Sequence, residues 1–145
     1  MRPSLLDAYR RTTFFAGTPA GRLGLRIGET CSGLDALLER NGAETWAYVT
    51  AFNPGSVRVS EDENIARHRQ LEDAVARRGF VSYPGEGVGD DGCWPPEPSL
   101  LILGIGREES ERLGREFGQV AVVYGERGRE GELLLCGRQG QGSGA

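Results

Sequence analysis

Three hydrogen-bonding side chains fall on the buried side of a helix that the sequence predicts at 64–78. At about 100° per residue, Asn64, Arg67 and His68 lie within roughly 60° of the apolar stripe that contains Leu71. A helix that only packs against a core would carry Leu or Ala there. The planar guanidinium of Arg67 is suited to binding a carboxylate or a phosphate through two hydrogen bonds. The pattern predicts a polar pocket; capping and surface ion pairing at the helix start are the equally weighted alternative.

The apolar strand predicted at 46–52 ends beside this polar group. Asn53 opens the turn that follows the strand, and Ser60 and Glu63 have the spacing of a capping box at the start of the helix. We therefore expect Asn53 and the three polar helix residues to meet at one strand end.

A second candidate is the segment 84–98, which is rich in Gly, Pro and Asp and is predicted to be a loop. Trp94 and Glu97 flank two prolines, which restrict the backbone and hold both side chains in place. An aromatic face beside a carboxylate suits a cationic or heteroaromatic ligand. The simpler alternative is a flexible hairpin loop. No helix N-terminus follows the glycines, so a dinucleotide site is not predicted, and Asp90 and Asp91 lack the further ligands of a metal site.

The composition is that of one globular domain. The chain has 145 residues, 38% of them hydrophobic and 26% charged, enough for a single core. A net charge of −4 argues against a general nucleic-acid binder. There is no apolar run of about 18 residues and no signal peptide, so we expect a cytoplasmic protein without a membrane partner. Three scattered cysteines and one histidine predict reduced thiols, no metal and no cofactor.

The elements that must position these residues follow the order β-α-β-β-α-β, the order of an α+β ferredoxin-like fold with an antiparallel sheet. The first and third strands of that fold are central, and here they are the most continuously apolar. The predicted strands lie at 46–52, 80–83, 99–105 and 119–124, the helices at 64–78 and 107–117, and a further strand at 132–136 can pair with the fourth.

The first 44 residues are predicted to form an accessory layer in front of this core. Beta-prone runs at 9–15 and 22–27 form a hairpin, and Ser32 caps a short helix that carries Leu34, Leu37 and Leu38. The prediction is a single domain at 1–136, with the accessory layer at 1–44 and the core at 45–136. The Gly-rich tail at 137–145 is predicted to be disordered.

The order of these motifs resembles phage S-adenosylmethionine (SAM) lyases, formerly called SAM hydrolases. Those enzymes carry a Ser-Ala-Phe strand, an Asn-x-x-Arg-His-Arg helix start and a Gly-Cys-Tyr-x-Glu loop. This chain has Thr-Ala-Phe at 50–52, Asn-Ile-Ala-Arg-His-Arg at 64–69 and Gly-Cys-Trp-Pro-Pro-Glu at 92–97, so its glutamate lies one residue further on. The likeness covers about 47–124. Over about 9–136 the chain also resembles a bacterial domain family with no assigned function.

The lyase resemblance implies a PII-like homotrimer with its active sites between subunits and no cofactor. The substrate's carboxylate attacks its own γ-carbon, which releases 5′-methylthioadenosine and homoserine lactone; relatives in type III CRISPR systems act on a SAM–AMP conjugate. Glu97 is then the catalytic residue, holding the cationic part of the substrate. The remaining residues implied to bind substrate are Tyr48, Asn53, Asn64, Arg67, His68 and Trp94.

Two other functions are compatible with the sequence. A non-catalytic PII-like sensor would bind a nucleotide between subunits and move the segment 84–98. An interaction module would inhibit a partner protein through the same segment. Turnover of SAM separates the lyase from the sensor, and a ligand-induced thermal shift separates both from the interaction module.

Overall fold

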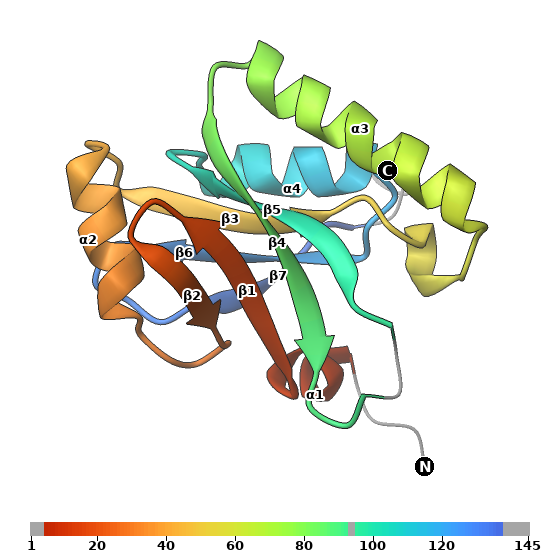
Figure 1. Cartoon of the computed structure of the whole chain (residues 1–145), viewed down its shortest axis with the longest axis horizontal. Helices are drawn as coiled ribbons and strands as arrows, with labels where there is room; N and C mark the ends of the chain where they lie inside the picture. Colours follow the sequence, from red (N-terminus) through yellow and green to blue (C-terminus); the bar gives the residue numbers. More distant parts are fainter. Residues whose placement is uncertain (1–4, 93–94, 138–145) are drawn as a thin grey trace.

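The computed structural model describes residues 5–92 and 95–137, which form a mixed α+β fold (Figure 1). Within these residues there are four α-helices, a short 3-10 helix and seven strands. The helices are α1 (Leu5–Arg10), α2 (Ser32–Arg40), α3 (Glu61–Arg77) and α4 (Arg107–Glu116), with η1 (Pro54–Ser56) between β3 and α3. The strands are β1 (Thr12–Thr18), β2 (Gly21–Leu25), β3 (Thr45–Thr50), β4 (Val81–Gly89), β5 (Glu97–Leu103), β6 (Ala121–Glu126) and β7 (Glu132–Leu135).

All seven described strands belong to one antiparallel sheet in the order β2-β1-β4-β5-β3-β6-β7. The predicted inner positions of β3 and β5 are confirmed, since these strands pair with each other and each has a further neighbour. Pairing of β7 with β6 is confirmed as well. The prediction of an α+β fold with an antiparallel sheet is therefore correct.

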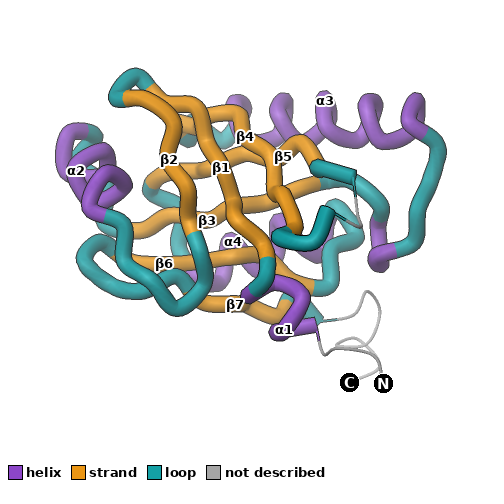
Figure 2. Tube along the Cα trace, turned by 60° about the horizontal axis from the view of Figure 1, so that its bottom comes forward, coloured by secondary structure: helices purple, strands orange, loops and turns teal. Residues whose placement is uncertain are grey.

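Both faces of the sheet are covered. Ala47 and Val49 of β3 belong to a core that includes residues of α3 and α4, whereas Trp46 and Tyr48 belong to a second core with α2. Figures 1 and 2 show α3 and α4 on one side of the sheet. Because successive residues of a strand point to opposite faces, a strand covered on both sides needs an unbroken apolar run. That requirement explains the continuous apolar character of β3.

Helix α3 begins where the capping signal predicts. The Ser60 hydroxyl accepts a hydrogen bond from the Glu63 backbone N–H at 3.1 Å. Leu71 and Val75 are buried, and Asn64 is buried on the same side near the start of the helix. The expected apolar face of α4 is also confirmed, because Ser110, Leu113 and Phe117 are buried.

The segment predicted as a loop at 84–98 is largely strand. Strand β4 runs on to Gly89, pairs with both β1 and β5, and β5 already begins at Glu97. Gly and Pro favour a loop when only local composition is considered. Here a missing side chain permits pairing, because a Cβ at Gly85 would collide with the Phe15 carbonyl oxygen. The loop prediction is therefore wrong over most of its first half.

The N-terminal hairpin is confirmed, and it extends the sheet beyond β4. Two local predictions there are wrong. Tyr9 belongs to α1, not to the hairpin, and the N-cap of α2 is Cys31, so Ser32 is the first helical residue. The helix still buries its three leucines because their spacing places them on one face.

Two sequence predictions concern other parts of the chain. Of the tail predicted to be disordered, residues 138–145 lie outside the described residues. Among the described residues, no helix combines the length and the apolar character that crossing a membrane requires.

Candidate functional site

A cavity of about 510 Å³ lies on the sheet face opposite α3 and α4. Neighbouring strands point alternate residues into it, among them Tyr48 and Thr50 of β3 and Ser99 of β5. Strand β4 contributes Gly87 and Gly89 to the lining. Since neither residue has a side chain on this face, the cavity extends down to the backbone of β4.

The cavity wall combines aromatic rings with polar groups. The Tyr48 and Phe14 rings meet edge to face, with their centroids 5.2 Å apart. Exposed Arg11 and Asp91 lie at the rim. Further residues of the lining are Tyr9, Phe52, Asn53, Glu97 and Gln119.

Asn53 positions Glu97. The Asn53 side-chain Nδ2 donates a hydrogen bond to Glu97 Oε2 at 2.8 Å. Asn53 follows the end of β3, has φ 49° and ψ 66°, and so occupies the left-handed region that Asn tolerates better than most residues. Glu97 begins β5, which is antiparallel to β3. Strand pairing therefore brings the amide and the carboxylate together, although 44 positions separate them.

Asn64 holds Asn53 in place from α3. Asn64 Oδ1 accepts from the Asn53 backbone N–H at 2.8 Å, and its Nδ2 donates to Asn53 Oδ1 at 3.0 Å. The Val59 N–H donates to the same Asn53 oxygen at 3.0 Å. Asn53 and Asn64 are only 7% and 6% exposed, and buried polar groups satisfied in this way form rigid networks. Asn64 is thus a positioning residue for Asn53 and does not line the cavity.

Arg67 also lies outside the cavity lining. Its Nε donates to the Ala51 carbonyl oxygen at 2.9 Å, and its Nη2 donates to the Phe117 carbonyl oxygen at 2.6 Å. Phe117 is the C-cap of α4, where a cation interacts favourably with the helix dipole. These two nitrogens therefore join the end of β3 to the end of α4.

His68 lies behind the cavity wall. Its ring meets the Phe52 ring at a centroid distance of 6.3 Å and an interplanar angle of 76°. Nε2 is 3.5 Å from Glu72 Oε2, and among the described residues the buried Nδ1 has no hydrogen-bond partner. Of this pair only Phe52 lines the cavity, so His68 packs against the outer side of the cavity wall.

Two tyrosine hydroxyls near the cavity are held in their protonated form. Tyr48 donates to the Phe15 carbonyl oxygen at 2.6 Å, and Tyr9 donates to the Ala121 carbonyl oxygen at 3.3 Å. Burial raises the pKa of Tyr48 well above its usual range. Burial, and next the negative charge of Glu97, raise the pKa of Tyr9 in the same direction. At neutral pH both hydroxyls are therefore donors.

The structure brings some of the predicted site residues together. Tyr48, Asn53 and Glu97 line one cavity, whereas Asn64, Arg67 and His68 support it from behind. Trp94 lies outside the described residues. Among residues 5–92 and 95–137 there is no group of three or more His, Cys, Asp or Glu side chains placed to hold a metal ion.

The lining residues that sequence reasoning did not assign to the site include Tyr9, Phe14 and Gln119. Gln119 has a local signal, because it is a buried polar residue just before an apolar strand. Its Nε2 donates to the Phe52 carbonyl oxygen at 3.1 Å. Tyr9 and Phe14 carry no such signal, since only the pairing of β1 with β4 brings them to the site.

Comparison with known families gives one match. The family model described as Protein of unknown function (DUF3293) matches residues 49–122, about half of the chain. The chain belongs to this DUF3293 family. No curated protein and no solved structure matches it. The region matched to the DUF3293 model contains Asn53, Asn64 and Glu97, whereas Tyr9 and Phe14 precede it.

Proposed function

We propose that the cavity binds SAM or a SAM–nucleotide conjugate and that the protein cleaves this ligand as a lyase. The observation that carries the proposal is the Glu97 carboxylate, oriented by Asn53 in a cavity with four aromatic rings. A carboxylate suits the cationic part of SAM, and aromatic rings suit its adenine and its positive charge. A cavity of about 510 Å³ lies in the range of small-molecule sites. The sequence resemblance to phage SAM lyases supports the same substrate.

The proposed reaction needs few protein groups. The substrate carboxylate attacks the γ-carbon, the carbon–sulfur bond breaks, and its electron pair remains on sulfur. The products are neutral 5′-methylthioadenosine and homoserine lactone, and no proton has to move. The protein holds the methionine part in a reactive conformation and limits its access to water.

Glu97 is best used at the ammonium group of the methionine part. The sulfonium loses its positive charge as the bond breaks, so a carboxylate beside sulfur would stabilise the substrate more than the transition state. The ammonium keeps its charge throughout. A carboxylate beside it orients the reacting chain without opposing the charge change at sulfur.

The proposal includes the finer architecture and the assembly. The elements β3-α3-β4-β5-α4-β6, with the strand order β4-β5-β3-β6, support a ferredoxin-like, PII-like core. Among the described strands, the edge strands β2 and β7 each have a neighbour on one side only, and Leu135 of β7 is 61% exposed. We propose a homotrimer that resides in the cytoplasm. The free thiols of Cys31 and Cys136 suit that reducing compartment. Light scattering that gives a strictly monomeric mass would refute the trimer.

The first experiment measures turnover. The protein is incubated with SAM and, separately, with SAM–AMP, and 5′-methylthioadenosine products are quantified by chromatography. We expect Glu97→Gln to lower the rate by about 10²–10³, the usual loss for one well-placed electrostatic contact in a dry site. Glu108→Gln, an equal charge change at an exposed position of α4, is the control and should keep the wild-type rate. Full turnover by Glu97→Gln would refute the role of Glu97, and no product from the wild type would refute the lyase.

A non-catalytic sensor is the second candidate. It is favoured by the hydrogen bonds of Tyr48, Asn53 and Gln119, which are made within the protein and satisfy groups that a catalyst would turn toward its substrate. Binding of SAM without product formation would identify the sensor.

A further inference from the structure

The N-terminal segment supplies one wall of the cavity. Ala8 and Tyr9 of α1, Arg11 after it, and Thr12 and Phe14 of β1 all line it. These residues precede the region 49–122 that matches the DUF3293 family model. The cavity is therefore built jointly by the family region and by a segment outside the match.

This wall is attached to the family region by direct contacts. The Tyr9 hydroxyl donates to Ala121 of β6, inside the matched region, and the Tyr48 hydroxyl, one residue before that region, donates to Phe15 of β1. The rings of Tyr9 and Phe14 lie 6.0 Å apart between centroids, and Phe14 in turn contacts Tyr48. The aromatic groups thus form a continuous row from α1 to β3.

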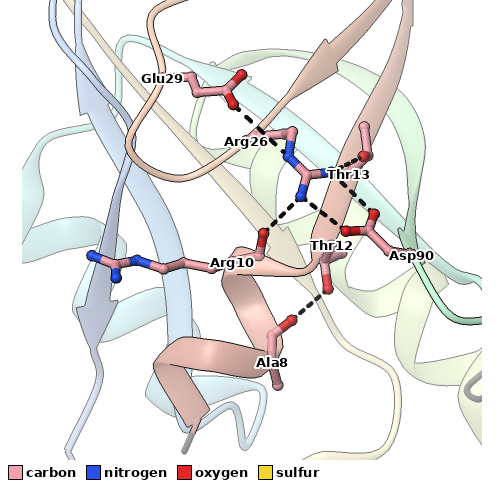
Figure 3. A network of polar contacts seen from close by, with 7 residues as sticks. All are labelled: Ala8, Arg10, Thr12, Thr13, Arg26, Glu29 and Asp90. Atoms are coloured by element: carbon pink, nitrogen blue, oxygen red, sulfur yellow. Dashed lines mark hydrogen bonds and ion pairs between the residues drawn. The ribbon is translucent and has the colours of Figure 1, made fainter.

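Arg26 fixes the corner between α1 and β1 (Figure 3). Its Nη1 donates to Thr13 Oγ1 at 2.6 Å and to Asp90 Oδ1 at 3.0 Å. Its Nη2 donates to the Arg10 carbonyl oxygen at 2.8 Å and to Asp90 Oδ2 at 3.0 Å. A bidentate pair has a defined geometry, so the corner is held against the end of β4. Arg11, the next residue, is consequently held at the cavity rim.

Arg11 carries a positive charge that is open to a ligand. Among residues 5–92 and 95–137, no side chain or backbone group forms a hydrogen bond or an ion pair with its guanidinium. Asp90 is bound by Arg26 through both oxygens. Arg26 chiefly, and Arg11 by its charge, hold the pKa of Asp90 below its usual range. The carboxylate next to Arg11 is therefore already engaged by another arginine.

We propose that Arg11 binds an anionic group of the ligand, a carboxylate or a phosphate, while Tyr9 and Phe14 contact its ring system. The N-terminal wall then determines which ligands the cavity accepts. The inference rests on the proposed function for the adenosyl nature of the ligand. It adds that the cavity offers a partner for an anionic group of the ligand at Arg11, besides the partner for its cationic group at Glu97.

The test compares three probes by titration calorimetry. S-adenosylhomocysteine carries a carboxylate and lacks the sulfonium leaving group, AMP carries a phosphate, and 5′-methylthioadenosine carries no anionic group. We expect Arg11→Gln to lower the affinity for S-adenosylhomocysteine or for AMP about threefold to tenfold, the range for an exposed charged contact. The affinity for 5′-methylthioadenosine should not change. If only the affinity for S-adenosylhomocysteine falls, Arg11 binds a carboxylate. If only the affinity for AMP falls, Arg11 binds a phosphate.

Arg10→Gln is the matched control. It removes the same charge one position earlier, and Figure 3 shows the Arg10 side chain extending away from the Arg26 network. Wild-type affinity for the anionic probes should fall as salt is added, and this dependence should be weaker in Arg11→Gln.

Three results would overturn the inference: no change in Arg11→Gln, an equal loss for 5′-methylthioadenosine, or an equal loss in Arg10→Gln. Failure of all three probes to bind the wild type would overturn it as well. Failure of the lyase proposal would be seen separately: the wild type would form no 5′-methylthioadenosine from SAM, while Arg11→Gln would still lower the affinity for the anionic probes alone.

Discussion

At the scale of single residues, two glycines of β4 that face the same side have different reasons to be glycine. A Cβ at Gly85 would collide with the Phe15 carbonyl oxygen and lie 2.8 Å from the Tyr48 hydroxyl oxygen. A Cβ at Gly87 would lie 3.5 Å from the Phe14 ring, an ordinary contact. Gly85 is required by the close approach of β1, whereas Gly87 leaves space in the cavity.

This difference predicts unequal effects of one chemical change. Gly85→Ala should lower the free energy of unfolding by about 1–3 kcal/mol, because the backbone of β1 must move. Gly87→Ala should change it by no more than about 0.5 kcal/mol. Urea denaturation of both variants measures the difference. Equal losses would show that β1 and β4 do not approach as closely as described.

At the scale of elements, Arg67 connects three of them. It belongs to α3, and its guanidinium donates to carbonyl oxygens after β3 and at the end of α4. The sequence prediction assigned this guanidinium to a ligand. The structure shows two of its nitrogens bound to backbone, which makes Arg67 a connection between the elements that surround the site.

We predict that Arg67→Gln lowers the free energy of unfolding by about 2–4 kcal/mol, since two buried carbonyl groups lose a charged donor. Arg69→Gln, on the exposed side of the same helix, should stay within about 0.5 kcal/mol of wild type. Thermal and urea denaturation provide the measurement. If Arg67→Gln keeps wild-type stability and instead weakens an anionic probe, the original ligand-binding prediction is the better one.

At the scale of the whole molecule, the sheet separates two cores, and Cys136 helps to close the one beneath α3 and α4. Cys136 is 1% exposed, and Arg115 Nη1 donates to its carbonyl oxygen at 2.8 Å. Burial raises the pKa of the Cys136 thiol to about 11 from its usual 9.0. The folded protein therefore keeps a proton that the unfolded chain releases between these values.

Stability should consequently fall at alkaline pH. The contribution of Cys136 is fully present below pH 9 and is lost as the pH rises through about 11, with a limiting slope of about 1.4 kcal/mol per pH unit. Free energies of unfolding between pH 8 and 10 measure this slope, and Cys136→Ala should reduce it while Cys31→Ala should not. The raised pKa values of Tyr9 and Tyr48 lower the stability only above pH 10, and they do so equally in the wild type and in both cysteine variants. Identical slopes in wild type and Cys136→Ala would contradict the assignment.

The sequence by itself determined the elements whose signals are local. The cap at Ser60, the continuous apolar run of β3 and the buried face of α4 depend on neighbouring residues, and all three are present. Tyr48, Asn53 and Glu97 were assigned to one site through the resemblance to phage SAM lyases, and the pairing of β3 with β5 places all three at one cavity.

Only the tertiary structure decided the features that depend on distant partners. The strand at Gly85–Gly89 forms because β1 lies beside it, so a segment with loop composition becomes part of the sheet. Tyr9 and Phe14 reach the cavity through the same pairing. Arg67 binds backbone because the carbonyl groups that follow β3 and α4, those of Ala51 and Phe117, lie beside it. Composition and periodicity describe a residue and its neighbours in the sequence. The strand that pairs with the glycine-rich end of β4, and the carbonyl groups that bind the Arg67 guanidinium, are set by the folding of the whole chain.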